Sequence, residues 1–354
     1  MTAPSPALAD VASWMLPGGR PPATPEDDAQ VAALVGGAIG ARLTGPLLLA
    51  VDVGALELPE RAVDELVEAH RQALQWCLHL ELRLLEVRGW FEAAGGVEHR
   101  VLKGPAVAHL DELDPSLRTF ADLDLLVAAE DLDRAVAAIT THGGRRPWAE
   151  RRPGYDRRFA KSVTLTCTDG VELDLHRSLA DGVHGFRIPL ERLFATPDRF
   201  DVGGQQVTAL GSVHRLLHAA YHAVLGSPSP RLASLRDLAG LLVRADLQPD
   251  AVLPEARRWR GEAVLAEAVA SAAGALTFEA PAWRRWADGY VAEPAEVAII
   301  ERQRAEGSAL GRGKLVAARE LGDRRARAAY AVALAWPSRA HLRSRDMRRR
   351  DLLR

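Results

Sequence analysis

Two aspartates one residue apart interrupt an otherwise apolar run, and they constrain the fold of this chain more than any other feature. The run at positions 122–127 reads Asp-Leu-Asp-Leu-Leu-Val, with acids at Asp122 and Asp124. In a β-strand, residues i and i+2 point to the same face, so the two carboxylates would project together about 6.6 Å apart. Carboxylates side by side in a buried place repel each other and lose hydration, and a divalent cation removes that cost. The run therefore predicts a Mg²⁺ site; the alternative is a solvated edge strand, which the flanking apolar residues disfavour.

A third acid lies in a second strand-like segment. Residues 171–176 read Val-Glu-Leu-Asp-Leu-His, so Glu172, Asp174 and His176 share one face and the apolar residues share the other. An Asp-Gly dipeptide at 169–170 separates this segment from a β-type run at 162–168, which is typical of a hairpin. A hairpin strand beside the first acidic strand would bring Asp174 near both aspartates. The alternative is an amphipathic strand with one face in water, and His176 has either a site role beside Asp174 or a structural one.

A glycine turn is the next element of the pattern. Lys103-Gly104-Pro105 falls between a predicted strand at 97–102 and a predicted short helix at 105–110. Glycine lets a phosphate approach the backbone, a helix N-terminus offers free N–H groups, and Lys103 adds a cation. The alternative is a plain strand-to-helix turn with a surface lysine.

The remaining pattern divides the chain into four parts. Residues 1–25 are rich in Pro, Ala and Gly and predict a disordered leader; residues 26–95 predict helices, the longer from about 59 to 94. Residues 96–205 mix strand and helix patterns, and residues 206–354 are helical again, with an Arg-rich tail from 339 that predicts a solvated helix end rather than an RNA contact. The predicted fold class is α+β, a compact α/β unit between helical segments.

Composition narrows the partners and the compartment. The 354 residues carry a formal net charge of −2, so the chain is no polycation and nucleic acid is an unlikely partner. Two cysteines, Cys77 and Cys167, give no disulfide framework, which favours a reducing compartment. The N-terminus lacks a signal-peptide pattern, and no apolar run reaches the roughly 18 residues of a membrane span. A cytoplasmic protein without a membrane partner is expected.

The ordered set of these motifs resembles the bacterial uncharacterised nucleotidyltransferase family, within the DNA polymerase beta-like superfamily. The set comprises Leu102-Lys103-Gly104, then Arg118, then the acidic strand, then Asp174-Leu175-His176. The resemblance implies a minimal nucleotidyltransferase core, a short mixed sheet flanked by helices, followed by a helical domain. It also implies two Mg²⁺ ions held by Asp122, Asp124 and Asp174, with a nucleotide triphosphate bound at Lys103, Gly104 and Arg118.

One departure from the superfamily pattern concerns the turn. Most active members carry Gly-Ser or Gly-Gly there, whereas this chain has Lys-Gly-Pro, and Pro105 has no N–H and so removes one phosphate donor. The expected function is transfer of a nucleoside monophosphate from an NTP, with ATP as the expected donor, to a hydroxyl of a small-molecule or peptide acceptor. The alternative is a non-catalytic nucleotide- or partner-binding protein that keeps the fold.

Polar residues of the helical domain complete the candidates. His214, His218 and His222 recur every four residues on a predicted helix, but no Glu stands beside His218, so the zinc-protease signature is absent. Packing, or contact with nucleotide or acceptor, is favoured for this row over metal binding. Arg236-Asp237 predicts an interdomain ion pair, with a site role for Asp237 as the alternative.

Overall fold

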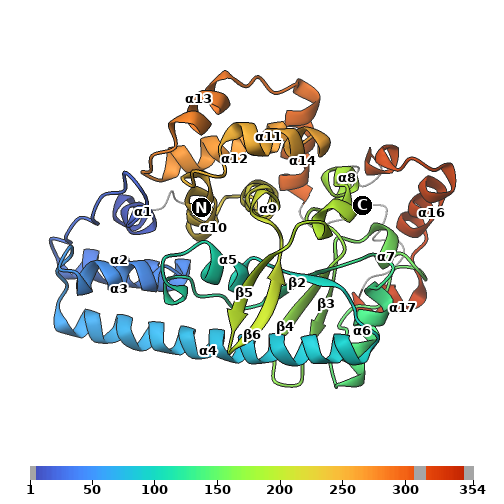
Figure 1. Ribbon diagram of the computed structural model, residues 1–354, viewed down its shortest axis with the longest axis horizontal. Coiled ribbons are helices and arrows are strands. Elements are labelled where there is room, and N and C mark those ends of the chain that lie inside the picture. Colours follow the sequence, from blue (N-terminus) through green and yellow to red (C-terminus); the bar gives the residue numbers. More distant parts are fainter. Residues whose placement is uncertain (1–4, 307–315, 347–354) are drawn as a thin grey trace.

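A six-stranded mixed sheet lies at the centre of the computed structural model, which describes residues 5–306 and 316–346 (Figure 1). The strands are β1 (His99–Leu102), β2 (Leu123–Val127), β3 (Ser162–Thr166), β4 (Glu172–His176), β5 (Asp198–Val202) and β6 (Gln205–Ala209). Their order in the sheet is β3-β4-β2-β1-β6-β5. The β2–β4 and β1–β6 pairs are parallel and the other neighbours are antiparallel. The predicted α+β class, with a short mixed sheet flanked by helices, is confirmed.

One face of the sheet packs on a long helix. The helix α4 (Glu60–Ala93) runs along this face together with α6 (Leu132–Thr141) (Figure 1). Odd-numbered strand residues such as Leu123, Leu125 and Leu173 are fully buried in the same apolar cluster as Leu84 of α4. Because side chains alternate along a strand, the even-numbered residues point away from α4. The acids of β2 and β4 therefore belong to the opposite face.

That opposite face is covered by the helical domain. Leu102 and Leu126 point into a second core, which also holds apolar residues of α9 and α10. The helices of this side are α9 (Ser212–Leu225), α10 (Leu232–Leu242), α11 (Pro249–Arg258), α12 (Glu262–Ala275), α13 (Pro281–Gly289) and α14 (Pro294–Glu306). Figure 1 shows this bundle above the sheet, with α4 below it. The acids thus lie between the sheet and the helical domain.

The N- and C-terminal segments pack on the flanks. The remaining elements are α1 (Pro6–Ser13), α2 (Asp28–Ala41), α3 (Thr44–Asp52), α5 (Gly104–Leu110), η1 (Pro115–Leu117), α7 (Asp156–Phe159), α8 (Gly182–Arg187), η2 (Leu190–Phe194), η3 (Ala318–Glu320), α16 (Arg324–Ala335) and α17 (Arg339–Ser344). Tyr330 of α16 packs with Tyr155 and Phe159 in a small third core. This core lies beside the β3 edge of the sheet (Figure 1).

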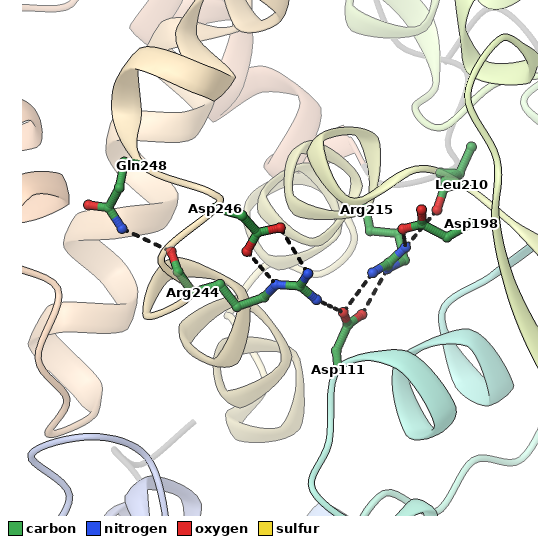
Figure 2. Close-up of polar contacts among 7 residues, drawn as sticks. All are labelled: Asp111, Asp198, Leu210, Arg215, Arg244, Asp246 and Gln248. Carbon is green, nitrogen blue, oxygen red and sulfur yellow. Dashed lines mark hydrogen bonds and ion pairs between the residues drawn. The ribbon is translucent and has the colours of Figure 1, made fainter.

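Buried ion pairs join the sheet domain to the helical domain. Asp111, after α5, accepts hydrogen bonds from Arg215 of α9 at 2.8 and 2.9 Å and from Arg244, after α10, at 3.1 Å. Arg215 also contacts Asp198 of β5, and Figure 2 shows the whole network bridging the two domains. The side chain of Asp111 is 2% exposed, so its charge depends on these guanidinium groups rather than on water.

Two expectations about chain organisation need correction. Residues 6–13 form α1, and Val11 and Ala12 are buried against the helical domain. A disordered leader over 1–25 is therefore wrong for this segment, because its Pro- and Ala-rich composition is compatible with a short helix capped by Ser5. The α/β unit does not end at 205, because β6 continues to Ala209 and pairs with β1. The first part of the Arg-rich tail forms α17, in which Leu342 is buried while Arg339 and Arg343 are exposed, and residues 347–354 lie outside the described part.

The predicted Arg236–Asp237 ion pair also has a different form. Arg236 donates to both carboxylate oxygens of Glu112, at 3.0 and 3.1 Å, and to backbone carbonyls around α1. Asp237 instead accepts two hydrogen bonds from Arg118. Both residues therefore link domains, each with a partner from the sheet domain. Over the described ranges, no helix has both the length and the apolar character needed to cross a membrane.

Candidate functional site

The acids of β2 and β4 meet because the two strands are parallel neighbours. In their register, Asp124 lies directly opposite Asp174, and Leu126 lies opposite His176. Paired residues of adjacent strands share a face, so both carboxylates point toward the helical domain. One ligand atom from each of Asp124, Asp174 and His176 lies within 4.8 Å of the others. The sheet thus brings two acids and one imidazole to a single point.

Asp124 is buried, and its two oxygens have different partners. The Nε2 atom of His176 lies 2.6 Å from Oδ1, and the Nζ atom of Lys103 lies 2.8 Å from Oδ2. Burial opposes the charge on this carboxylate, but the positive charge of Lys103 and the hydrogen bond from His176 more than offset it, and the pKa of Asp124 falls well below its usual range. Asp124 is therefore ionised wherever the protein is folded near neutral pH.

Asp174 is positioned from the edge strand. The hydroxyl of Thr164, its cross-strand neighbour on β3, donates a 2.5 Å hydrogen bond to Oδ1. Glu172 lies two residues earlier on the same strand. Burial, followed by the negative charges of Asp174, Asp122 and Asp124, raises the pKa of Glu172. Four acids thus interact electrostatically at this end of β2 and β4.

Asp122 has a less central place than the sequence predicts. The strand begins at Leu123, and Asp122 lies in the bend before it, half-buried. Asp122 is not among the three residues that could share one ion. Its carboxylate still acts on Glu172, so it lies in the same acidic region. His176 takes its place among the three converging ligands.

The turn that carries Lys103 has an uncommon backbone. Lys103 has φ 43° and ψ −143°, and Gly104 follows with φ 26°. A Cβ atom on Gly104 would come within 3.3 Å of the ring of Phe120, so both conformation and space favour glycine there. Non-glycine residues rarely adopt a positive φ, and such a conformation persists where the surrounding structure stabilises it. At Lys103 the ion pair with Asp124 provides that stabilisation.

Arg118 is ion-paired with a residue of the helical domain. Its guanidinium donates to both oxygens of Asp237, at 2.7 and 2.8 Å, and also contacts the carbonyl of Thr119. Both side chains are buried. The ion pair thus gives Arg118 and Asp237 an interdomain linking role, and a phosphate contact of Arg118 stays a prediction.

The histidines of α9 divide into two groups. His214 lies 3.5 Å from Glu255 of α11 and stacks on Trp259, so it contacts the helical domain rather than the acids of β2 and β4. Burial, followed by the charge of Lys103, lowers the pKa of His218 well below 6.5 and that of His222 to about 3. His218 and His222 line a pocket together with Lys103 and Asp237, and both are neutral at pH 7. They line this pocket, beside Lys103, as uncharged imidazoles.

Lys161 lies near the acids but belongs to none of the sequence motifs described above. It directly precedes β3 and is half-buried. Burial and the charge of Lys103 lower its pKa, whereas Asp124, Asp181 and Asp174 act in the opposite direction. Lys161 belongs to no motif, but the composition carries a signal, since the chain has only three lysines, Lys103, Lys161 and Lys314, against 42 arginines.

The donor set fits a divalent cation. Two carboxylates, completed by substrate phosphates and water, are the usual protein ligands of Mg²⁺, and the imidazole of His176 would also suit Mn²⁺ or Zn²⁺. Burial is the largest cause of the raised pKa of Glu172, and the negative charges of Asp174, Asp122 and Asp124, which a cation would relieve, add to it. Asp124 and Asp174 are thus the central candidates for holding a metal, with His176 as a third ligand or as the group that orients Asp124.

Comparison with known proteins adds a family match. The model of a family described as uncharacterised nucleotidyltransferase matches residues 29–276, which include all the site residues above. A crystal structure of an antigenic nucleotidyltransferase-like protein from Paracoccidioides brasiliensis is 14% identical to this chain, with 59% of this chain and 97% of that one covered and a TM-score of 0.33. Among curated proteins, none matches the chain.

Proposed function

The chain belongs to the uncharacterised nucleotidyltransferase family, and from this premise we propose that it transfers a nucleoside monophosphate from an NTP to a hydroxyl group. ATP is the expected donor, and a small molecule or a peptide is the expected acceptor. The observation that carries the proposal is the register of β2 and β4, which sets Asp124 beside Asp174 on the face that Lys103 also reaches. A pair of acids next to a lysine suits a metal-bound polyphosphate.

Each residue of the site has a distinct task in this proposal. Asp124 and Asp174 would hold the metal, which would supply positive charge for the phosphates and for an acceptor hydroxyl that loses its proton. Lys103 neutralises the phosphates at the turn, where Gly104 leaves room for them. Asp174, held by Thr164, accepts the hydroxyl proton, and His176 fixes the orientation of Asp124. Asp122 and Glu172 are the acids left for a second Mg²⁺ ion.

The test is pyrophosphate release from NTPs with Mg²⁺ across a panel of hydroxyl acceptors. Asp124→Asn and Asp174→Asn are each expected to lower the rate by roughly 10²-fold or more, as for the loss of one preorganised charge-stabilising group. Asp64→Asn is the matched control, because Asp64 is an exposed acid of α4, on the other side of the sheet. Activity that survives the double change at 124 and 174 would show that the acids are not the catalytic site.

A non-catalytic nucleotide-binding protein is the second candidate, and one observation favours it. Lys103 already neutralises Asp124 at 2.8 Å, so the protein supplies its own cation at the position of the metal. Metal-dependent NTP binding, measured by calorimetry, without pyrophosphate release for any acceptor would support this candidate. Product mass separates nucleotidyl from phosphoryl transfer if turnover is found.

A further inference from the structure

The end of the β3–β4 hairpin beside His176 carries two basic residues, Lys161 and Arg177. Lys161 precedes β3, Arg177 follows β4, and the carbonyl of Lys161 accepts a 2.8 Å hydrogen bond from the backbone N–H of Arg177. Within residues 5–306 and 316–346, the ammonium of Lys161 has neither an ion pair nor a hydrogen bond, and Arg177 has no ion pair. Such positive charge is costly to hold in a partly buried place unless an anion arrives.

Arg177 is the more deeply buried of the two. Arg177 is 7% exposed. Its guanidinium donates one 2.9 Å hydrogen bond to the carbonyl of Ala160 and lies 5.9 Å from the centre of the Phe186 ring. Asp181 interacts electrostatically with both Arg177 and Lys161, and Lys161 also lies in the field of Asp124 and Asp174.

The identity of the residue at position 161 is itself informative. The chain uses arginine at 42 of its 45 basic positions, yet both lysines within the described ranges, Lys103 and Lys161, act on Asp124. An ammonium is a compact point charge on a flexible stem, whereas a guanidinium is a wide planar fork. A crowded site that must place a single cation against one oxygen of an anion suits lysine better.

The two lysines flank the acids from different strands. In the sheet order β3-β4-β2-β1, Lys103 follows β1 and Lys161 precedes β3, with Asp124 and Asp174 on the two strands between them. Lys103 is ion-paired to Asp124, whereas Lys161 has no ion pair with any residue that the structure describes. In-line transfer needs the attacking hydroxyl and the departing pyrophosphate on opposite sides of the phosphorus atom. With the phosphates at Lys103 and Gly104, the acceptor approaches from the side of Lys161.

We propose that Lys161, supported by Arg177, binds an anionic group of the acceptor, so that the acceptor is a hydroxyl compound that also carries a phosphate or carboxylate. This inference rests on the proposed function. In the transfer step, the acceptor hydroxyl oxygen bonds to the α-phosphorus, the bond from that phosphorus to the bridging oxygen breaks, and pyrophosphate leaves with the electron pair. The hydroxyl proton passes to Asp174.

Inorganic phosphate is the probe for the binding test. Calorimetry of the full chain with Mg²⁺ and an α,β-methylene NTP is expected to show phosphate binding that Lys161→Met weakens by about tenfold or more, the usual loss for one charge-assisted hydrogen bond. Lys161→Arg is expected to retain part of the affinity. Nucleotide affinity is expected to change by less than about twofold in either variant, and Arg199→Met, an exposed cation of β5, is the charge-matched control.

Two results would overturn the inference. Equal phosphate affinity in the wild type and in Lys161→Met would show that no anion binds Lys161. A loss of nucleotide affinity in Lys161→Met, with phosphate binding unchanged, would make Lys161 a ligand of the triphosphate. If the wild type binds no nucleotide, the proposed function fails, and the phosphate titration of the unliganded protein still decides the anion site separately.

Turnover gives a second readout of the same inference. Pyrophosphate release is measured with pairs of hydroxyl compounds that differ only in a phosphate or carboxylate, such as glycerol and glycerol 3-phosphate. The anionic member of a pair is expected to stimulate release, and Lys161→Met is expected to raise its KM by about tenfold with a smaller change in kcat. Stimulation by neutral members to the same extent would refute an anionic acceptor.

Discussion

The Arg118–Asp237 ion pair makes a sharp prediction about how the helical domain is attached. Asp237 of α10 accepts two hydrogen bonds from Arg118, four residues before the bend that holds Asp122. The two side chains are 11% and 8% exposed. Burial opposes the charge on Arg118, but Asp237 more than offsets it and raises the pKa of Arg118. Removal of Asp237 would leave that charge buried without its partner.

The magnitude follows from the burial of the pair. Loss of one partner from a buried ion pair costs about 3–5 kcal/mol, because the other charge stays desolvated. The Arg244–Asp246 pair provides a contrast, since its aspartate is 57% exposed and exposed pairs contribute about 0–1 kcal/mol. We therefore expect Asp237→Asn to lower the free energy of unfolding by about 3 kcal/mol or more. Asp246→Asn is expected to lower it by under about 1 kcal/mol.

The measurement is urea unfolding followed by circular dichroism, with linear extrapolation to water. The double variant Arg118→Leu with Asp237→Leu is expected to lose less stability than Asp237→Asn, since no charge then remains buried without a partner. Equal losses for Asp237→Asn and Asp246→Asn would refute the reasoning, because burial would then make no difference to the energy of the pair.

Three further predictions address the site. Thr164→Val removes the hydroxyl that holds Asp174, and we expect pyrophosphate release to fall by about tenfold with little change in NTP affinity; an unchanged rate would exclude a positioning role for Thr164. Burial lowers the pKa of His222 to about 3 in the folded protein. Between about pH 6.5 and pH 3 the imidazole is therefore protonated in the unfolded chain but neutral in the folded chain, and stability falls as the pH falls through that window. Between pH 7 and pH 5 this loss amounts to about 2 kcal/mol at most, and urea unfolding of His222→Gln at both pH values is expected to show a smaller loss than the wild type; equal losses would exclude this group. Lys103→Met removes the cation that pairs with Asp124, so calorimetry is expected to show tighter Mn²⁺ binding without nucleotide but weaker NTP binding; a parallel loss of both affinities would contradict competition between Lys103 and the metal.

The central acid pair was predictable because two simple patterns agree. Alternation placed Asp124 on the face away from the apolar strand residues, and the same alternation placed Asp174 and His176 together. The sequence could not show which strands are neighbours, since the parallel β2–β4 contact joins segments that are separated by α6 and β3. The hairpin signal at 169–170 located β4 beside β3, as the structure has it. The position of β2 next to β4 is a property of the assembled sheet.

The residues that the sequence placed less well depend on tertiary contacts. Arg118 stands near the acids in sequence, but its partner Asp237 is 119 positions away, and nothing local indicates that pairing. Asp122 fits the alternating strand pattern, yet residues 121–122 form a bend and the strand starts only at Leu123. Lys161 shows no motif in its neighbours, and only the scarcity of lysine singles it out.

Charge balance explains why one site can hold a lysine and still suit a metal. Before any substrate arrives, Lys103 and His176 occupy the two oxygens of Asp124, so the buried carboxylate is neutralised by the chain itself. A metal-bound triphosphate brings both a cation for the acids and anions for the lysines. Lys103 can then exchange Asp124 for a phosphate oxygen without leaving either charge unpaired, at a turn where its backbone is already in an uncommon conformation. Among the described residues, Lys161 has no such carboxylate to give up, which is why we propose that its charge serves a second anion.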